Sequence, residues 1–308
     1  MVRSVPLVYR MQRFELLAVG AIGAILIVLA IVVARELEGV GYGACYLAES
    51  APPSCEALGR RFYDIQNAHA SPVASFMTLL PYALGLFLGA PLIAREIERG
   101  TARLAWSIAP SRIRWYAWRV VPVVVFGVVL AFAAGFAVDR LVAARTPGID
   151  LENSFEAFGQ RGALVAITAF VMLAGAIGLG TVIGRVLPTV IAALVLGAAG
   201  ISGVQHLHTD FTAREAVIVD EADVRPGDRY IDQFFKLPDG RVVGWEELEQ
   251  IDPASVASET GPTYPIVYSV IPAERYREVE AREALILGSI GVAMLVGAGV
   301  IVTRRRPG

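Results

Sequence analysis

The residues best equipped for binding chemistry gather in one stretch, residues 94–119, which reads AREIERGTARLAWSIAPSRIRWYAWR. It contains six arginines, two glutamates and three tryptophans, and an uncharged apolar run lies on each side of it. Arginine interleaved with aromatic residues is typical of a nucleic-acid-binding surface, a membrane interface or a docking site for another protein. The order of the residues and the elements that flank them decide among these three.

The first two-thirds of this stretch has the pattern of two short helices joined by a bend. Glu96 and Glu98 lie among arginines and are followed by Gly100, a residue type that commonly ends a helix. Thr101 is a candidate N-cap for a second helical piece, TARLAWSIA, which the sequence PSR then ends. We interpret this bent pair, from Glu96 to Arg112, as a shape that fits a groove on a partner protein.

Nucleotide chemistry is limited by the single lysine of the chain, Lys236, which lies in FFKLPDG. A P-loop needs a lysine within G-K-[ST], so no Walker motif is present. If ATP drives this protein, a separate subunit must bind it, and we expect no cofactor, metal or catalytic residue on this chain. His206, His208 and Asp210 in HLHTD are candidate metal ligands, but polar residues leaving an apolar segment are the simpler explanation.

Six windows contain no charged residue, and each approaches the roughly 20 residues that a helix needs to cross a bilayer. A soluble core helix is rarely apolar on all sides over that length, and the mean hydropathy is +0.57. We therefore predict an all-α polytopic membrane protein with six transmembrane helices. A signal peptide is the alternative for the first window, although its apolar run exceeds the usual length of about 7–15 residues. The windows are 16–34, 70–94, 120–138, 162–184, 186–205 and 284–303.

The placement of arginine predicts the side of the membrane on which each loop lies. With the N-terminus in the cytoplasm, the inner segments hold 13 of the 27 basic residues and only three acids. This positive-inside pattern places both termini and the loop 95–119 in the cytoplasm. A short loop held at both ends by membrane helices disfavours nucleic acid. Trp115, Tyr116, Trp118 and Arg119 directly precede the third window, and we interpret them as membrane-interface anchors that contact lipid.

The only two cysteines, Cys45 and Cys55, fall in the first predicted outer loop, GACYLAESAPPSCEALGRRF. That side of the membrane permits disulfides, and ten residues with a Pro-Pro between them can close a loop. We predict a Cys45–Cys55 disulfide, with two unpaired thiols as the alternative. Two cysteines alone supply too few ligands for a structural metal ion.

Residues 206–283 form a loop that is too long for a simple connector and has a pattern of its own. AVIVDEADV is typical of a strand, Asp239-Gly240 between apolar runs indicates a hairpin, and AERYREVEAREALIL is typical of a helix that enters the sixth window. We predict a small, acidic α+β extracytoplasmic cap over 206–283. It separates the five helices of residues 1–205 from the last helix and basic tail, 284–308.

The stretch APLIAREIERGTARLAWSIAPSRIRWYAWR resembles the loop after the second span of type-2 ATP-binding cassette (ABC) exporter permeases of the bacterial multidrug and antibiotic-export type. Bacterial members have the pattern apolar-x-x-E-x-x-x-G-T, then a tryptophan, then Ser-Arg-x-x-Trp. The six-span plan and the cysteine-bearing outer loop are also similar, so the resemblance covers most of the chain. A family motif before the last span, Pro-x-x-Arg-Phe-Trp, is matched in part by Pro272, Arg275 and Tyr276. The matching residues in the loop are Glu96, Gly100, Thr101, Trp106, Ser111, Arg112 and Trp115.

The resemblance implies a half-transporter, in which two permease copies or two similar chains pair with two ATPase subunits that bind ATP and Mg²⁺. The bent pair of helices would act as a coupling helix in a groove of the ATPase. Thr78, Tyr82 and Phe87 of the second span are candidates to line a substrate path near the dimer axis, with packing against lipid or other helices as the alternative. The implied ATPase-coupling residues are Glu96, Glu98, Gly100, Thr101, Trp106 and Arg112.

These observations together favour a plasma-membrane exporter, in a cell of bacterial type, that moves a drug, antibiotic or other amphipathic small molecule. A secondary transporter is disfavoured because such proteins often use ionisable residues inside the membrane, and the six windows have none. The main alternative is a non-transporting sensor, in which the acidic cap binds a ligand and the basic loop docks a signalling protein.

Overall fold

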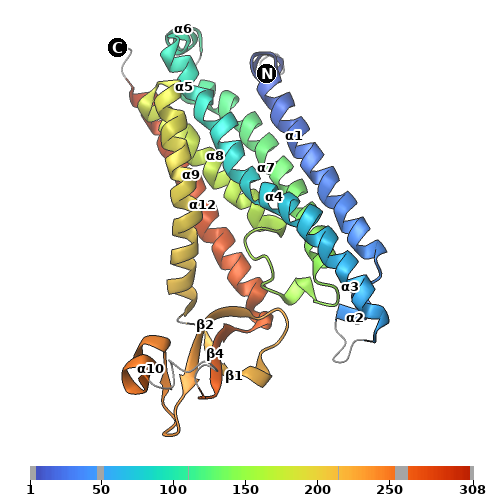
Figure 1. Cartoon of the computed structure of the whole chain (residues 1–308). Helices are drawn as coiled ribbons and strands as arrows, with labels where there is room; N and C mark the ends of the chain where they lie inside the picture. The colour runs from blue at the N-terminus through green and yellow to red at the C-terminus, as the bar shows by residue number, and fades with distance from the viewer. Residues whose placement is uncertain (1–4, 47–51, 110, 214, 254–262, 306–308) are drawn as a thin grey trace. The chain divides into compact units, whose positions relative to one another are not determined.

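The computed structural model describes residues 5–46, 52–109, 111–213, 215–253 and 263–305, with side chains described outside 5–12, 103 and 201–213 (Figure 1). The chain divides into two compact units. Unit 1 comprises Met1–Gly148, Ala157–Gly200 and Glu280–Gly308, and unit 2 comprises Ile149–Glu156 and Ile201–Val279. The predicted cap, 206–283, overlaps most of unit 2, but the sequence did not predict that the segment 149–156 joins it.

Long apolar helices make up unit 1, as expected for segments whose backbone must satisfy its own hydrogen bonds in lipid. The helices are α1 (Val5–Gly39), α2 (Gly43–Tyr46), α3 (Ser54–Ile65), η1 (Gln66–Ala70), α4 (Ser71–Leu84), η2 (Gly85–Gly89), α5 (Ala90–Glu98), α6 (Thr101–Ile108), α7 (Arg112–Arg145) and α8 (Gly162–Ile183). Two further helices, α9 (Val186–Ala213) and α12 (Tyr276–Arg304), begin in one unit and end in the other.

Five of the six predicted windows are confirmed as helices that are long and apolar enough to cross a membrane. These helices cover Arg13–Gly39, Ser54–Glu98, Arg112–Arg145, Gly162–Ile183 and Ala273–Arg304. The remaining window, 186–205, lies in α9, of which the stretch Val186–Gly200 is a shorter apolar helix. The count of six spans and the orientation of the chain therefore stay predictions.

The second candidate span is longer and less regular than its window of 70–94 indicates. It runs for 45 residues from Ser54 to Glu98 and includes two π-helical turns, η1 and η2. Pro91 follows η2 and has no N–H to donate back to Phe87, so a wider turn is tolerated there. The prediction found the apolar part of this helix and missed both its continuous extension and its irregular turns.

The turn η2 packs closely against α8 because a glycine stands at each end of it. A Cβ added to Gly85 would lie 2.8 Å from the backbone oxygen of Met172, and one added to Gly89 would lie 3.0 Å from the Cβ of Ala176. Small residues spaced by four positions let membrane helices approach in this way. The contact between the second and fourth candidate spans therefore depends on the absence of side chains at these two positions.

We expect the substitution Gly85→Ala to destabilise the protein by about 1–3 kcal/mol, because a methyl group there must displace the backbone of α8. Gly178→Ala in α8 is the matched control, since nothing lies within 4 Å of a Cβ built at that position. Thermal denaturation of the two variants in detergent, followed by size-exclusion fluorescence, measures the difference. Equal midpoints for both variants would contradict the close packing of η2 on α8.

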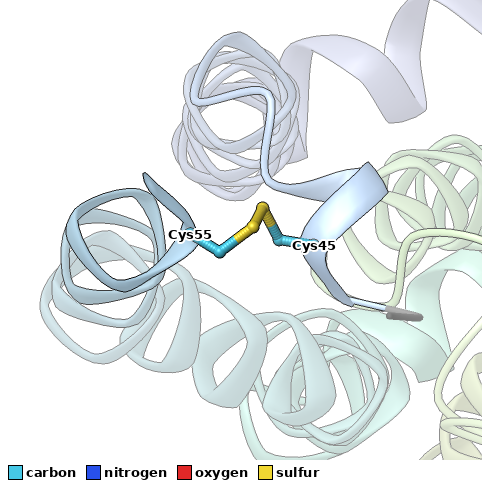
Figure 2. The surroundings of a disulfide bond; sticks show 2 residues. All are labelled: Cys45 and Cys55. Carbon is cyan, nitrogen blue, oxygen red and sulfur yellow. A yellow bond between two sulfur atoms is a disulfide. The ribbon is translucent and has the colours of Figure 1, made fainter. Parts of the chain in front are cut away.

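The predicted disulfide is present and joins α2 to α3 (Figure 2). The Cα atoms of Cys45 and Cys55 are 5.7 Å apart. Beside the bond, the ring of Tyr42 contacts Phe62 at a centroid distance of 5.0 Å, and Phe62 contacts Tyr63 at 5.5 Å. The covalent bond and the ring cluster together hold the turn after α1 against the start of the second long helix.

Unit 2 contains a four-stranded antiparallel sheet in the order β1-β4-β2-β3 and the helix α10 (Trp245–Ile251). One buried apolar cluster of this unit comprises Phe235, Leu237, Val243 and Leu248. The strands are β1 (Val217–Asp220), β2 (Arg229–Lys236), β3 (Val242–Val243) and β4 (Ile266–Ile271). The strand predicted over AVIVDEADV is confirmed only for β1, because a 3-10 turn, η4 (Glu221–Asp223), follows it directly.

The predicted hairpin joins β2 to β3. Gly240 has a φ of 84°, a left-handed conformation that glycine adopts at little cost, and Leu237 N donates to Arg241 O across the turn. The backbone N–H and the guanidinium of Arg241 both donate to the Asp239 carboxylate and hold the pKa of that carboxyl below its usual value. The hairpin predicted from Asp239-Gly240 is therefore confirmed.

The segment 149–156 joins unit 2 through backbone and side-chain contacts. Within it, η3 (Leu151–Asn153) is a single 3-10 turn. Phe155 N donates to Gly227 O at 2.8 Å, and the Phe155 ring contacts Tyr276 at a centroid distance of 5.5 Å. Glu152 also forms an ion pair with Arg277. Arg277 precedes the sixth window, after η5 (Ala273–Arg275) and within the helix predicted to enter it.

Candidate functional site

The stretch around Gly100 folds as one short helix between the ends of two long ones, and we call residues 96–119 the elbow. Gly100 has a φ of 71°, which ends α5 and lets the chain turn sharply into α6. Ser111 caps the start of α7 by accepting a hydrogen bond from Arg114 N. The predicted pair of short helices is therefore corrected: its first member is the end of the second long helix. Pro110 lies outside the described residues.

Glu96 is the central residue of the elbow and is only 7% exposed. Its Oε1 lies 3.1 Å from the Arg119 Nη1, and its Oε2 accepts a hydrogen bond of 2.7 Å from the Thr101 hydroxyl. The N-cap position of α6 is occupied by Gly100, so the predicted capping role of Thr101 is wrong. Thr101 instead bonds backward across the bend. Glu96 thus joins α5, α6 and α7, and it is not on the surface for a partner.

Two other acidic groups tie this end of unit 1 to neighbouring helices. Glu98 Oε2 accepts a hydrogen bond of 2.9 Å from Val186 N, at the first residue of α9. A carboxylate there is favourable because the first N–H groups of a helix have no partner within it. Arg95 of α5 also forms an ion pair with Glu15 of α1. The predicted coupling residue Glu98 is therefore a contact between helices.

Trp106 and Trp115 pack edge to face across the elbow, with ring centroids 5.9 Å apart. The Arg112 guanidinium lies 4.9 Å from the centre of the Trp106 ring and donates to the backbone oxygens of Thr303 and Arg305. An arginine over an aromatic face gains electrostatic attraction as well as packing. The predicted coupling residues Trp106 and Arg112 thus attach α6 to α7 and to the end of α12.

The membrane-interface role predicted for four residues needs correction at three of them. The side chains of Trp115, Tyr116 and Arg119 are buried, and Tyr116 donates a hydrogen bond to Leu295 O of α12. A buried side chain cannot reach lipid headgroups, so these three pack inside unit 1. Trp118 is half-buried, and its role as an anchor stays a prediction.

The exposed face of α6 is apolar, which the sequence analysis missed. Leu104 is 66% exposed and Ile108, one turn later, is 77% exposed. Figure 1 shows α6 at the same end of unit 1 as the start of α1 and the end of α12. The sequence contains the corresponding signal, an apolar pair at positions i and i+4 within TARLAWSIA. The prediction instead selected the charged and aromatic residues nearby. A short helix that presents two aliphatic side chains is suited to insertion in an apolar groove.

The three predicted path residues are only partly brought together. Thr78 and Tyr82 lie one turn apart in α4 and both are half-buried; the Thr78 hydroxyl is 3.0 Å from Ala74 O and 3.1 Å from Gln160 Oε1. Phe87 lies in η2, five residues after Tyr82 and off that face, with its side chain exposed. The structure therefore groups Thr78 and Tyr82 and leaves Phe87 apart.

Metal-ligating groups do not gather in the described part of the chain, where no three His, Cys, Asp or Glu side chains meet. The side chains of His206, His208 and Asp210 lie outside the described residues.

The apolar helices and the packed elbow define a multi-pass membrane protein of helical type. The model of a family described as "ABC-2 membrane transporter related" matches residues 16–208, which is more than half of the chain. The chain belongs to this family and is a permease-type membrane component. No curated protein and no solved structure matches it.

Proposed function

We propose that this chain is the membrane-spanning subunit of an ATP-driven ABC exporter. The observation that carries the proposal is the exposed apolar pair Leu104 and Ile108 on α6, a helix that the Glu96–Arg119 ion pair and the Arg112 contacts hold in place. Membership in the ABC-2 family supports the same role. In this proposal α6 docks in an apolar groove of a separate ATPase subunit, while the remainder of the elbow holds α6 at the correct angle.

The proposed complex contains two permease chains, which are identical or similar, and two ATPase subunits in the plasma membrane of a bacterial-type cell. ATP and Mg²⁺ bind to the ATPase subunits, because this chain has no Walker motif. The cargo is a drug, antibiotic or other amphipathic small molecule. Closure of the ATPases on ATP moves α6, and the helices attached to the elbow open the path outward.

Co-purification tests this proposal. A tagged chain is expressed in its native host, solubilised in mild detergent and analysed for bound subunits. We expect an ATPase with a Walker motif to co-purify in equal amount, and inside-out vesicles to accumulate a fluorescent amphipathic dye only when ATP is present. A co-purifying kinase, together with vesicles that accumulate no dye, would favour the sensor instead.

A further inference from the structure

The segment between α7 and α8, Ala157–Arg161, has a sharply folded backbone. Ala157 and Gly159 have φ values of 51° and 78°, and Gly162, the first residue of α8, has a φ of 63°. A left-handed conformation at alanine costs about 1–2 kcal/mol, so contacts with the rest of unit 1 must hold this segment in shape. We call residues 157–161 the returning segment, because it re-enters unit 1 before α8 starts.

The first residue of α8 lies beside the body of α7, several turns before the end of that helix. The backbone oxygen of Gly162 is in direct contact with Gly135, where no Cβ could be placed, and Gly135 is ten residues before the end of α7 at Arg145. Next to this contact, Arg161 is 5% exposed and its Nη1 lies 3.3 Å from Asp139 Oδ1. The returning segment therefore reaches the level at which the uncharged window of α7 ends.

Gln160 reaches deeper, as its contact with the second long helix shows. His69 Nδ1 lies 3.2 Å from Glu36 Oε2, which puts the outer ends of the windows 16–34 and 70–94 at one level. Thr78, which contacts Gln160, lies nine residues further along the second helix, about 13 Å of helical rise. The apolar interior of a bilayer is about 30 Å thick, so the Gln160 amide, which extends inward from a backbone near the level of Arg161, lies in its outer half.

The surroundings of Gln160 are inconsistent with lipid. Its side chain is exposed, although it carries an amide and follows an irregular backbone. An uncompensated amide in hydrocarbon is costly, and irregular backbone at this depth occurs where it is buried in protein or lines a water-filled space. Because Gln160 is exposed on the single chain, its amide faces either a water-filled space or a second chain, and the labelling experiment below separates these two cases.

We propose that Gln160 lines the outer half of the substrate path, with Thr78 as its neighbour in the wall. The Thr78 hydroxyl has one proton, shared between two acceptors, so most of the hydrogen-bonding capacity of the Gln160 amide is left for a passing molecule. Arg161 pairs with Asp139, and the Glu280 carboxylate lies 3.6 Å from a Cβ built at Gly162. The Gln160 amide itself suits an amphipathic molecule with uncharged carbonyl or hydroxyl oxygens. This inference rests on the proposed exporter role and specifies its site.

Thiol labelling tests the inference directly, because both native cysteines are joined in a disulfide and an introduced cysteine is the single free thiol. A charged, membrane-impermeant methanethiosulfonate is added outside intact cells that express the full complex. We expect Gln160→Cys to react about tenfold faster than Val129→Cys, a 62% exposed position in the window of α7, because only the former meets water. Tyr63→Cys, exposed in α3, shows that the outer surface is accessible.

Absence of labelling at Gln160→Cys, while Tyr63→Cys reacts, would overturn the inference. So would efficient cross-linking between two Gln160→Cys copies without labelling, since it would make this surface a contact between chains. Trapping the ATPase with ATP and vanadate separates this inference from the exporter role. A labelling rate that changes severalfold on trapping supports both. If trapping leaves the labelling rate unchanged, the result supports a polar path at Gln160 and contradicts ATP-driven opening.

Discussion

Replacing Leu104 and Ile108 together by aspartate is expected to release the ATPase subunit while the permease stays folded. The two side chains are exposed, so their loss removes no packing within unit 1. Burying two aliphatic side chains in a partner groove contributes about 3 kcal/mol or more, which corresponds to at least about a hundredfold in the dissociation constant. Two carboxylates in an apolar groove would weaken binding further.

The measurement is the amount of ATPase retained on the tagged permease after washing, with ATP-driven dye uptake as a second readout. Ser107→Asp is the matched control, because Ser107 is exposed on the same helix and the change adds charge without removing apolar surface. We expect the control to retain most of the ATPase and the double variant to retain almost none. Full retention by a double variant with an unchanged melting temperature would show that α6 is not the docking helix.

Glu96→Ala is expected to act through the fold instead, with a loss of about 3–5 kcal/mol of stability, because it removes a buried carboxylate that pairs with the buried Arg119 guanidinium. It also removes the acceptor of the Thr101 hydroxyl, which loosens the bend at Gly100. Both transport and ATPase binding should fall as a result. Thermal denaturation of the purified chain measures the direct effect.

A double replacement distinguishes this explanation from a surface role for Glu96. Glu96→Leu with Arg119→Leu removes both charges, and we expect it to recover most of the stability that Glu96→Ala loses. Glu98→Gln, which keeps an acceptor for Val186 N, should cost much less than Glu96→Ala. If the double variant has the melting temperature of the wild type but binds no ATPase, Glu96 or Arg119 is itself a partner contact.

The sequence predicts those features of this chain that local pattern determines. Uncharged windows identify five long helices, Asp239-Gly240 identifies a hairpin, and Gly100 identifies the end of a helix. The long helices follow from the apolar composition that a membrane requires, and the two turns follow from the φ angles that glycine tolerates. A short stretch of sequence is therefore enough to predict each of these features. The Cys45–Cys55 bond was predictable because the chain has no other cysteine to offer.

The side-chain roles in the elbow were less predictable, since they depend on residues far away in the sequence. Glu96 and Trp115 appear in the sequence as surface residues of a charged loop, yet both are buried by partners that only the folded chain brings near. The depth reached by Gln160 had no local signal either. It arises because α8 starts beside Gly135. The contact joins Gly135 to Gly162, and no helical or strand periodicity in the sequence predicts that these two residues meet.

The bonds around the elbow also determine how force would travel through unit 1. Glu98 bonds to the first residue of α9, Arg112 bonds to the end of α12, and Arg305, just beyond that end, donates to Thr181 O near the end of α8. These links join the elbow to the ends of three helices, so in the proposed exporter a displacement of α6 would act on all three at once. In the proposed exporter, the stiffness of the elbow would therefore determine how much of a movement applied at α6 is passed on to α8, α9 and α12.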